Sequence, residues 1–227
     1  MDASEPSLSS LVYGELKREL NEGLLRPGEF IDLRAFSKKL GISMSPLRDA
    51  LIRLEGEGFL RIYSRRGVMV RKLTLTDIRN IYGVVGALEA AVAAESVEEL
   101  GPEELARMEG LCSLMDSCLE RGSFSDYAKA NRDFHNIYLG RSNNPELLAS
   151  IRLGKERLYD FSRPSPCLEE WERASTAEHR RLASLFRARS REGVASYLRE
   201  VHWSYTVQEP FIRQFYGEIE AGDGGKP

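Results

Sequence analysis

The sequence lacks the features that mark membrane, secreted or disulfide-bonded proteins. No apolar run approaches the roughly 18 residues that cross a bilayer, and residues 1–6 lack the basic and apolar segments of a secretory signal. Cysteine occurs only three times, as Cys112, Cys118 and Cys167, without metal-type spacing. We therefore expect free thiols in a reducing cytoplasm and no membrane partner.

Signatures of common enzyme classes are also missing. The sequence has no glycine-rich phosphate-binding loop and no nucleophilic serine motif. Its 227 residues are 42% hydrophobic and 30% charged, which is typical of a globular protein with one large domain or two modest ones. We therefore expect a globular protein that is not an enzyme.

Charge is distributed unevenly along the chain. The net charge is −3, which argues against a general nucleic-acid coat protein. Residues 1–74, however, carry 13 Lys and Arg against 10 Asp and Glu, whereas the remaining residues carry 19 against 25. A small basic module joined to a larger acidic one suggests an anionic partner for the first. We expect a first domain at 1–73, a second at 74–220 and a disordered tail at 221–227.

The first module has the pattern of a winged helix-turn-helix. Periodic leucines predict three helices, and two β-type runs follow them: 8–22, 33–40, 43–56, 59–63 and 68–71. Gly41 is expected to end the second helix and Ser43 to cap the third. The short segment between the two β-type runs predicts a hairpin turn.

Outward-facing side chains of the third helix and the hairpin suit DNA recognition. Arg48 lies off the leucine face, where a guanidinium can bond guanine O6 and N7 in the major groove. Arg65 and Arg66, at the hairpin tip, suit a minor groove or phosphates. The expected contacts are Ser43, Met44, Ser45, Arg48, Arg65 and Arg66. A single exposed arginine is ordinarily solvated surface, but their joint placement favours DNA binding.

The second module is predicted to be helical throughout. Apolar periodicity and capping residues indicate six helices: 77–97, 102–120, 123–140, 145–163, 168–189 and 192–219. Thr76 is expected to cap the first of these, and Pro210 to kink or split the last. Six helices with polar connectors predict an all-α bundle.

Histidine is scarce and confined to the second module. His135, His179 and His202 lie on three different predicted helices, and Asn131 precedes His135 by one turn on the same face. Imidazoles converging from three helices, with Asn131 as a further ligand, would bind a divalent metal, Zn first and Ni or Mn next. A histidine in a bundle is more often a hydrogen-bonded core or surface residue, and this alternative stays open.

Residues 41–60, GISMSPLRDALIRLEGEGFL, together with the hairpin tip, resemble the GntR family of bacterial transcription regulators. The resemblance implies a winged helix-turn-helix that contacts DNA through Arg34, Ser43, Ser45, Arg48, Arg65, Arg66 and Gly67. This family usually has arginine where the chain has Met44. The operator sequence of the family is therefore not carried over.

Three segments of the second module, 131–135, 178–182 and 198–202, resemble the FCD effector domain of FadR-type GntR regulators. The resemblance implies a metal held by Asn131, His135, His179 and His202, the last one residue later than the family spacing. An arginine that often contacts a carboxylate effector is replaced here by valine, Val85. We expect the metal and other groups to hold the effector, with Arg132, Arg152 and Arg157 as candidates.

These observations predict a ligand-responsive transcription regulator. We expect a homodimer on a palindromic operator, switched by a small organic acid that prefers one conformational state. Neutral imidazole and amide ligands leave the metal charge uncompensated, which favours an anionic effector. In a first alternative the metal is structural or absent, and an apolar acyl-type effector contacts Val84, Val85, Leu88 and Val92. In a second, the protein is a metal-dependent enzyme with a DNA-binding appendage.

Overall fold

The computed structural model describes residues 7–159 and 168–216, and the elements below are those of this part of the chain. They are α1 (Leu8–Asn21), α2 (Leu33–Leu40), α3 (Met44–Gly56), β1 (Leu60–Tyr63), β2 (Gly67–Val70), α4 (Leu75–Ser96), α5 (Pro102–Glu120), α6 (Phe124–Leu139), α7 (Pro145–Tyr159), α8 (Glu169–Arg187), α9 (Arg191–Tyr197), the π-helical turn η1 (Leu198–His202) and α10 (Tyr205–Tyr216).

The chain divides into two compact units. Within the described residues, one holds 7–73 and 155–159, and the other holds 74–154 and 168–216. The sequence-based boundaries did not group 155–159 with the first unit. The predicted tail at 221–227 lies outside the described residues.

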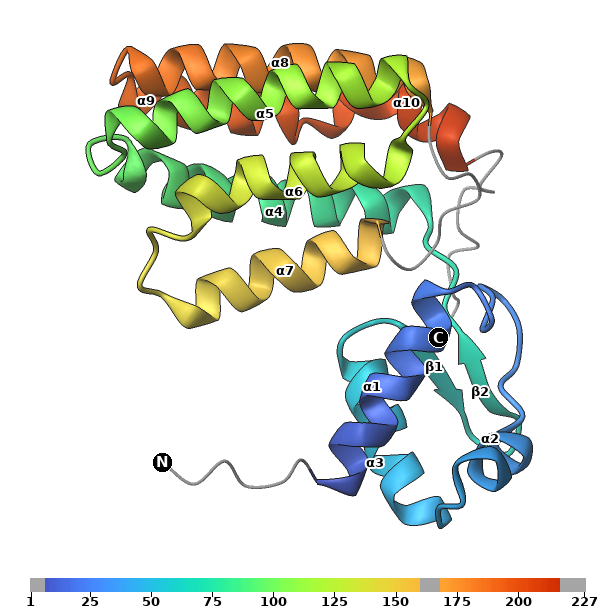
Figure 1. Ribbon diagram of the computed structural model, residues 1–227. Helices are drawn as coiled ribbons and strands as arrows, with labels where there is room; N and C mark the ends of the chain where they lie inside the picture. Colours follow the sequence, from blue (N-terminus) through green and yellow to red (C-terminus); the bar gives the residue numbers. More distant parts are fainter. Residues whose placement is uncertain (1–6, 160–167, 217–227) are drawn as a thin grey trace. The chain divides into compact units, whose positions relative to one another are not determined.

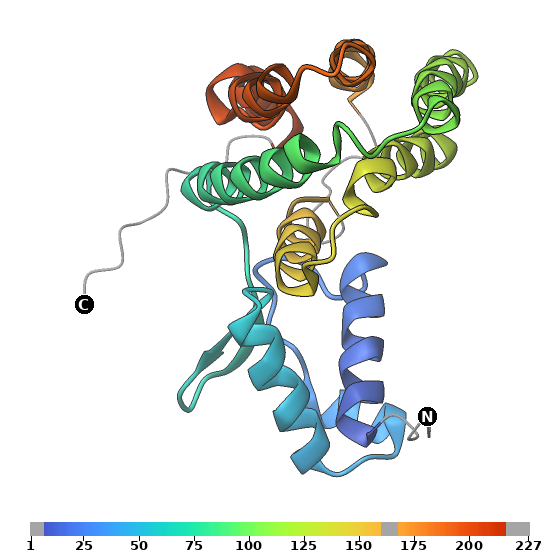
Figure 2. The same ribbon diagram turned by 90° about the vertical axis from the view of Figure 1, so that its left-hand side faces the viewer.

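The first unit is built on the packing of α1 against α3, visible in Figures 1 and 2. Leu16 of α1 and Leu47 and Leu54 of α3 are completely buried, as their helical spacing predicts. Gly41 ends α2 with φ +64°, and its N–H donates to the carbonyl oxygen of Lys38. Glycine adopts this left-handed conformation without strain, so the chain turns sharply into α3.

The wing is the antiparallel pair β1–β2, with Leu60 opposite Val70 and Tyr63 opposite Gly67 (Figure 2). The extended segment before α2 adds a short third row, because the N–H of Ile31 donates to the carbonyl oxygen of Val68. The turn between the strands contains Arg65, at φ +64°. The predicted order of three helices and a two-stranded wing is confirmed.

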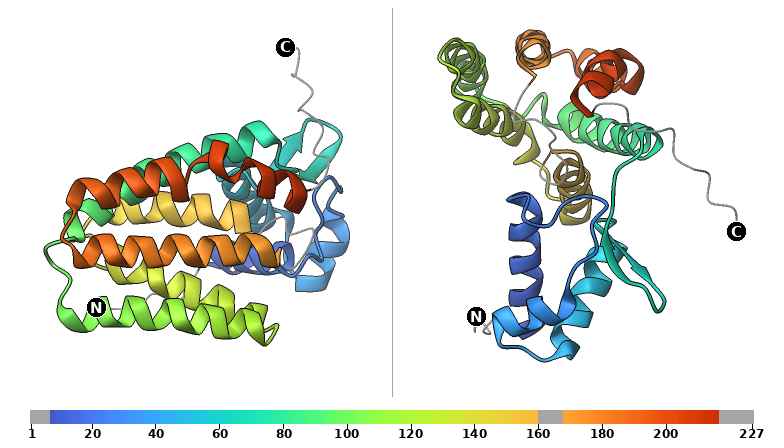
Figure 3. Two further views of the ribbon diagram at one scale, coloured as in Figure 1. Left: turned by 90° about the horizontal axis from the view of Figure 1, so that it is seen from above. Right: turned by 90° about the vertical axis from the view of Figure 1, so that its right-hand side faces the viewer.

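In the second unit α5 packs against α6 and α8, while α4 packs against α6, α9 and η1 (Figures 1 and 3). Aromatic side chains fill the core: Phe134, Tyr138 and Phe186 are completely buried, and the last two stack with ring centroids 5.4 Å apart. The fold class is as predicted, mainly α with a winged helix-turn-helix and an all-helical second domain.

Local details differ from the predictions at three helix ends. Thr74, not Thr76, caps α4, because Asp77 lies three residues after Thr74 and completes a reciprocal capping box. The last predicted helix is interrupted after η1, whereas Pro210 lies inside α10. Ser43 occupies the N-cap position of α3 without a side-chain hydrogen bond to the helix.

Within the described ranges, no helix combines the length and hydrophobicity that spanning a membrane would require.

Candidate functional site

The outward face of α3 carries a row of exposed side chains. Leu47 and Leu54 are buried on the opposite face, while Met44 is 48% exposed and Arg48 is also exposed. Ile52, one turn beyond Arg48 and 52% exposed, extends the row. Sequence analysis missed Ile52, although its spacing of four residues from Arg48 was a usable signal. In such a row the guanidinium can bond guanine, and the apolar side chains beside it can contact thymine methyl groups.

The other predicted DNA contacts are exposed and lie in three segments: the first turn of α2, the start of α3 and the wing turn. They are Arg34, Ser43, Ser45, Arg65, Arg66 and Gly67. Asp32 starts α2 by accepting hydrogen bonds from the N–H groups of Arg34 and Ala35. The Arg34 side chain therefore projects from the first helical turn, and its role in DNA binding stays a prediction.

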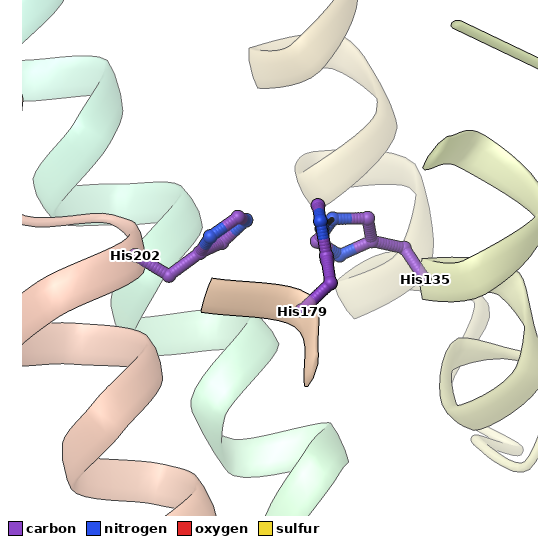
Figure 4. Close-up of side chains that lie close together, drawn as sticks. All are labelled: His135, His179 and His202. Carbon is purple, nitrogen blue, oxygen red and sulfur yellow. Dashed lines mark hydrogen bonds between the residues drawn. The ribbon is translucent and has the colours of Figure 1, made fainter. Parts of the chain in front are cut away.

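Three histidine side chains meet inside the second unit, as Figure 4 shows. His135 comes from α6, His179 from α8 and His202 from the last residue of η1. One nitrogen from each lies within 4.8 Å of the others, and Nε2 of His135 is 3.0 Å from Nε2 of His179. His135 and His179 are buried, and the His202 side chain is 9% exposed. The structure brings together the three histidines that the sequence singled out.

Two glutamates form hydrogen bonds with the Nδ1 atoms of His135 and His202. Nδ1 of His135 donates to Oε1 of Glu89, a completely buried carboxylate on α4. Nδ1 of His202 bonds Oε2 of Glu178 at 2.7 Å. A carboxylate at Nδ1 selects the tautomer whose Nε2 carries a lone pair, and it raises the basicity of that nitrogen. Sequence analysis did not assign this role to either glutamate.

Tyr138 completes the contacts of Glu89. Its hydroxyl donates to Oε1 of Glu89 and lies 2.6 Å from Nδ1 of His135. Burial, reinforced by the neighbouring Glu89 carboxylate, raises the pKa of Tyr138 well above its ordinary value. The hydroxyl therefore stays protonated and serves as a hydrogen-bond donor.

A second chain of hydrogen bonds fixes Glu178. Nε2 of Gln208, on α10, donates to Oε1 of Glu178 at 2.8 Å, and the indole N–H of Trp171 donates to Oε1 of Gln208 at 2.7 Å. These bonds connect His202 to α8 and α10. No sequence pattern links these residues, because Gln208 lies 30 positions after Glu178.

The three imidazoles fit a divalent metal. Zn–N bonds of about 2.0–2.1 Å place two ligand nitrogens roughly 3.0–3.4 Å apart, which the 3.0 Å between His135 and His179 matches. All three nitrogens lie within 4.8 Å of one another, so the His202 ring needs only a small movement toward the other two rings to reach the same separation. Imidazole donors with carboxylates behind them are typical of sites for Zn or other transition metals.

The remaining predicted site residues differ in how far they are buried. Asn131 lies one turn before His135 on α6 and is half-buried, whereas Arg132 and Arg152 are exposed and Arg157 is partly buried. Their contacts with metal or effector stay predictions.

Where the family often has an effector-binding arginine, this chain has Val85, which is completely buried. A Cβ built on Gly154 of α7 would lie 2.5 Å from a Val85 methyl carbon. The backbone of α7 at Gly154 therefore packs closely against Val85 and occupies the space beside it.

The cysteines are separate from this cluster in the described residues. Cys112 and Cys118 are buried free thiols on α5. Burial raises the pKa of Cys112 to about 11, which keeps its thiol protonated and disfavours metal binding. Cys167 lies outside the described residues.

Both units match known protein families. Residues 8–70 match the model of bacterial regulatory proteins of the gntR family, and residues 80–202 match the FCD domain. The chain is 29% identical over 202 residues to the HTH-type transcriptional regulator McbR of Escherichia coli, covering 86% of this chain and 89% of McbR. It is also 29% identical to the Nta operon transcriptional regulator of Aminobacter aminovorans, over 76% of this chain and 80% of that protein.

Solved structures show the same fold. E. coli McbR/YncC aligns with a TM-score of 0.64 at 24% identity, covering 95% of this chain and all of that one. A GntR protein from Rhodococcus sp. RHA1, described as a putative transcriptional regulator, aligns with a TM-score of 0.67 at 21% identity and the same coverage. A winged helix-turn-helix matching gntR regulators, followed by a helical unit matching the FCD domain, places this chain in the GntR family of transcription regulators with an FCD domain.

Proposed function

We propose that this regulator binds operator DNA through α2, α3 and the wing, and senses a small carboxylate at a metal held by His135, His179 and His202. The single observation that carries the sensing half is the convergence of three imidazole nitrogens within 4.8 Å. Carboxylates behind two of the rings support it, since they are the usual outer partners of metal-bound histidine.

A divalent metal bound here would supply a Lewis-acidic centre with positions left open for an effector oxygen. The protein's own groups hold the rings: Glu89 orients His135 and Glu178 orients His202. These carboxylates place negative charge near the site, which the charge argument from sequence did not include. The proposal of a carboxylate effector therefore rests on direct ligation at the open positions rather than on excess positive charge.

We propose a homodimer that places two recognition helices on a palindromic operator. The solvent-facing side of α4 supports a self-association surface, because its exposed residues from 83 to 91 are uncharged. They are Gly83, Val84, Ala87 and Ala91. A contiguous uncharged face of this kind suits contact with a second copy of the chain.

Neither the apolar-effector alternative nor the enzyme alternative gains support. The apolar lining proposed for an acyl-type effector is divided, because Val85 and Val92 are buried whereas Val84 is 54% exposed. Those side chains therefore do not face one pocket. For an enzyme, the printed names of the relatives above give no support, since they describe transcriptional regulators.

Chelation tests the proposed function. DNA affinity should be measured on a duplex that the protein selects from a random pool, with and without a panel of small carboxylates. We expect a carboxylate response in the Zn²⁺-loaded protein that disappears after chelation, while circular dichroism still shows a folded helical domain. We expect the domain to stay folded because its core is packed with apolar side chains such as Phe134, Leu182 and Phe186. If chelation melts the domain, the metal is structural and the sensing mechanism is wrong.

The wing arginines should act mainly through phosphate charge. Replacing Arg65 and Arg66 together by alanine is expected to weaken binding to all DNA sequences and to reduce the slope of log affinity against log salt by about 2. Titrations at several salt concentrations measure this slope. Arg18→Ala, which removes an exposed charge from α1, serves as the control. An unchanged slope in the double variant would show that the wing does not contact phosphates.

Asn131→Asp should strengthen the metal site and weaken the effector. A carboxylate is a better donor to a divalent cation than a neutral amide oxygen, so Zn²⁺ affinity is expected to rise. The added negative charge repels an anionic effector, whose affinity for the loaded protein should fall. Competition with a chromophoric chelator measures the first effect and calorimetry the second. Equal Zn²⁺ affinities for the wild type and the Asn131→Asp variant would remove this residue from the ligand set.

A further inference from the structure

The turn that carries His202 has an unusual hydrogen bond. In η1 the N–H of Trp203 donates to the carbonyl oxygen of Leu198 at 2.8 Å, an i→i+5 bond that spans one residue more than an α-helical turn. A residue near the end of such a turn faces the direction that its predecessor would face in an uninterrupted α-helix. The π turn therefore rotates both His202 and Trp203 relative to α9.

The buried residues of this segment follow the wider turn. Val194 and Leu198 are completely buried and four residues apart, whereas the next fully inward residue is Trp203, five further on and 3% exposed. With Trp203 continuing the apolar face, the ring of His202 lies with its centroid 4.9 Å from that of His179 and 5.1 Å from that of His135.

A glycine on α4 permits this placement. A Cβ built on Gly86 would lie 2.7 Å from Cβ of Trp203, a separation that real Cβ atoms essentially never show. The indole also packs edge-on against Tyr82, one turn earlier on α4, with centroids 5.3 Å apart. Trp203 is thus seated directly on the α4 backbone, and its neighbour His202 is fixed with it.

We propose that Gly86 and the π turn are a positioning device for the third metal ligand. Gly86 lets η1 approach α4, Trp203 locks into that contact, and the wide turn then directs His202 toward the other two histidines. This inference rests on the proposed metal site and adds to it the residues that decide whether His202 takes part.

Gly86→Ala tests the device, with Gly110→Ala on α5 as a matched control. Alanine raises helix propensity at both positions, but Gly110 is exposed and a Cβ there meets nothing within 4 Å. We expect Gly86→Ala to lower Zn²⁺ affinity about ten-fold or more, as the loss of an outer positioning contact does, while Gly110→Ala binds Zn²⁺ like wild type. Equal affinities in the two variants would overturn the proposal. Wild-type protein that fails to bind Zn²⁺ would instead overturn the proposed function itself.

A double-mutant cycle shows whether the effect passes through His202. In a His202→Ala background, Gly86→Ala should cause no further loss of Zn²⁺ affinity. Full additivity of the two losses would mean that Gly86 acts on the fold in general and would contradict the inference.

Deletion of Glu200 provides a test that does not depend on Gly86→Ala folding. Glu200 is an exposed residue inside the π turn, and this turn spans one residue more than an α-helical turn. Deleting Glu200 removes that additional residue, so the segment should become a regular α-helical turn in which His202 and Trp203 face the same directions as before. Zn²⁺ affinity is therefore expected to stay close to wild type. A loss as large as that of His202→Ala would show that the turn does not position the ligand in this way.

Discussion

His179→Ala is expected to lower Zn²⁺ affinity by more than about 100-fold, because removing a direct ligand should cost more than removing an outer partner. The His179 side chain is completely buried, and its Nε2 lies 3.0 Å from that of His135. A side chain on the protein surface therefore cannot take its place as a metal ligand. Competition against a chelator of known affinity measures the change. Ser184→Ala, an exposed substitution on the same helix, should leave the affinity unchanged.

The response to effector should disappear in the same variant. His179→Ala is expected to retain DNA binding, because α3 and the wing belong to the other compact unit. A variant that still binds Zn²⁺ tightly would mean that His179 is a core histidine. A variant that loses Zn²⁺ but keeps its carboxylate response would separate the metal from sensing.

Arg48→Ala should weaken specific DNA binding by about 1–3 kcal/mol and relax the preference at one base pair. Arg48 is exposed in the middle of the outward row of α3, between Met44 and Ile52, where a guanidinium can bond a guanine edge. The measurement is affinity for the selected duplex and for its single-base variants. Arg18→Ala removes the same charge from an exposed position on α1 and should change affinity only slightly. If Arg48→Ala binds with wild-type affinity and selectivity, Arg48 does not read a base.

Local sequence patterns predicted the first unit well because its determinants lie close together along the chain. The leucines of α3 recur at helical spacing, and Gly41 marks the sharp turn before it. The cap of α4 was also within reach: Thr74 and Thr76 both carry hydroxyls, but only Thr74 has an aspartate three residues later. Applying the capping-box pattern would have selected Thr74.

The surroundings of the histidines were not predictable in the same way. Scarcity and the family resemblance identified the histidines, but Glu89 is 46 residues from His135 in the sequence. Only the packing of α4 against α6 brings the two together. The π turn left one trace in the sequence, because His202 comes one residue later than the family spacing. Its cause, the hydrogen bond from the N–H of Trp203 to the carbonyl oxygen of Leu198 with Trp203 packed against Gly86, is a tertiary effect.

Metal content is the most direct test of the central claim that three histidines of the helical domain hold a metal. The purified protein, supplemented with Zn²⁺ and then desalted, should contain about one metal ion per chain by plasma mass spectrometry, with Ni or Mn as the other candidates. The His135→Ala, His179→Ala double variant should contain almost none. Less than about one ion per two chains in wild type, or equal content in the double variant, would contradict the account.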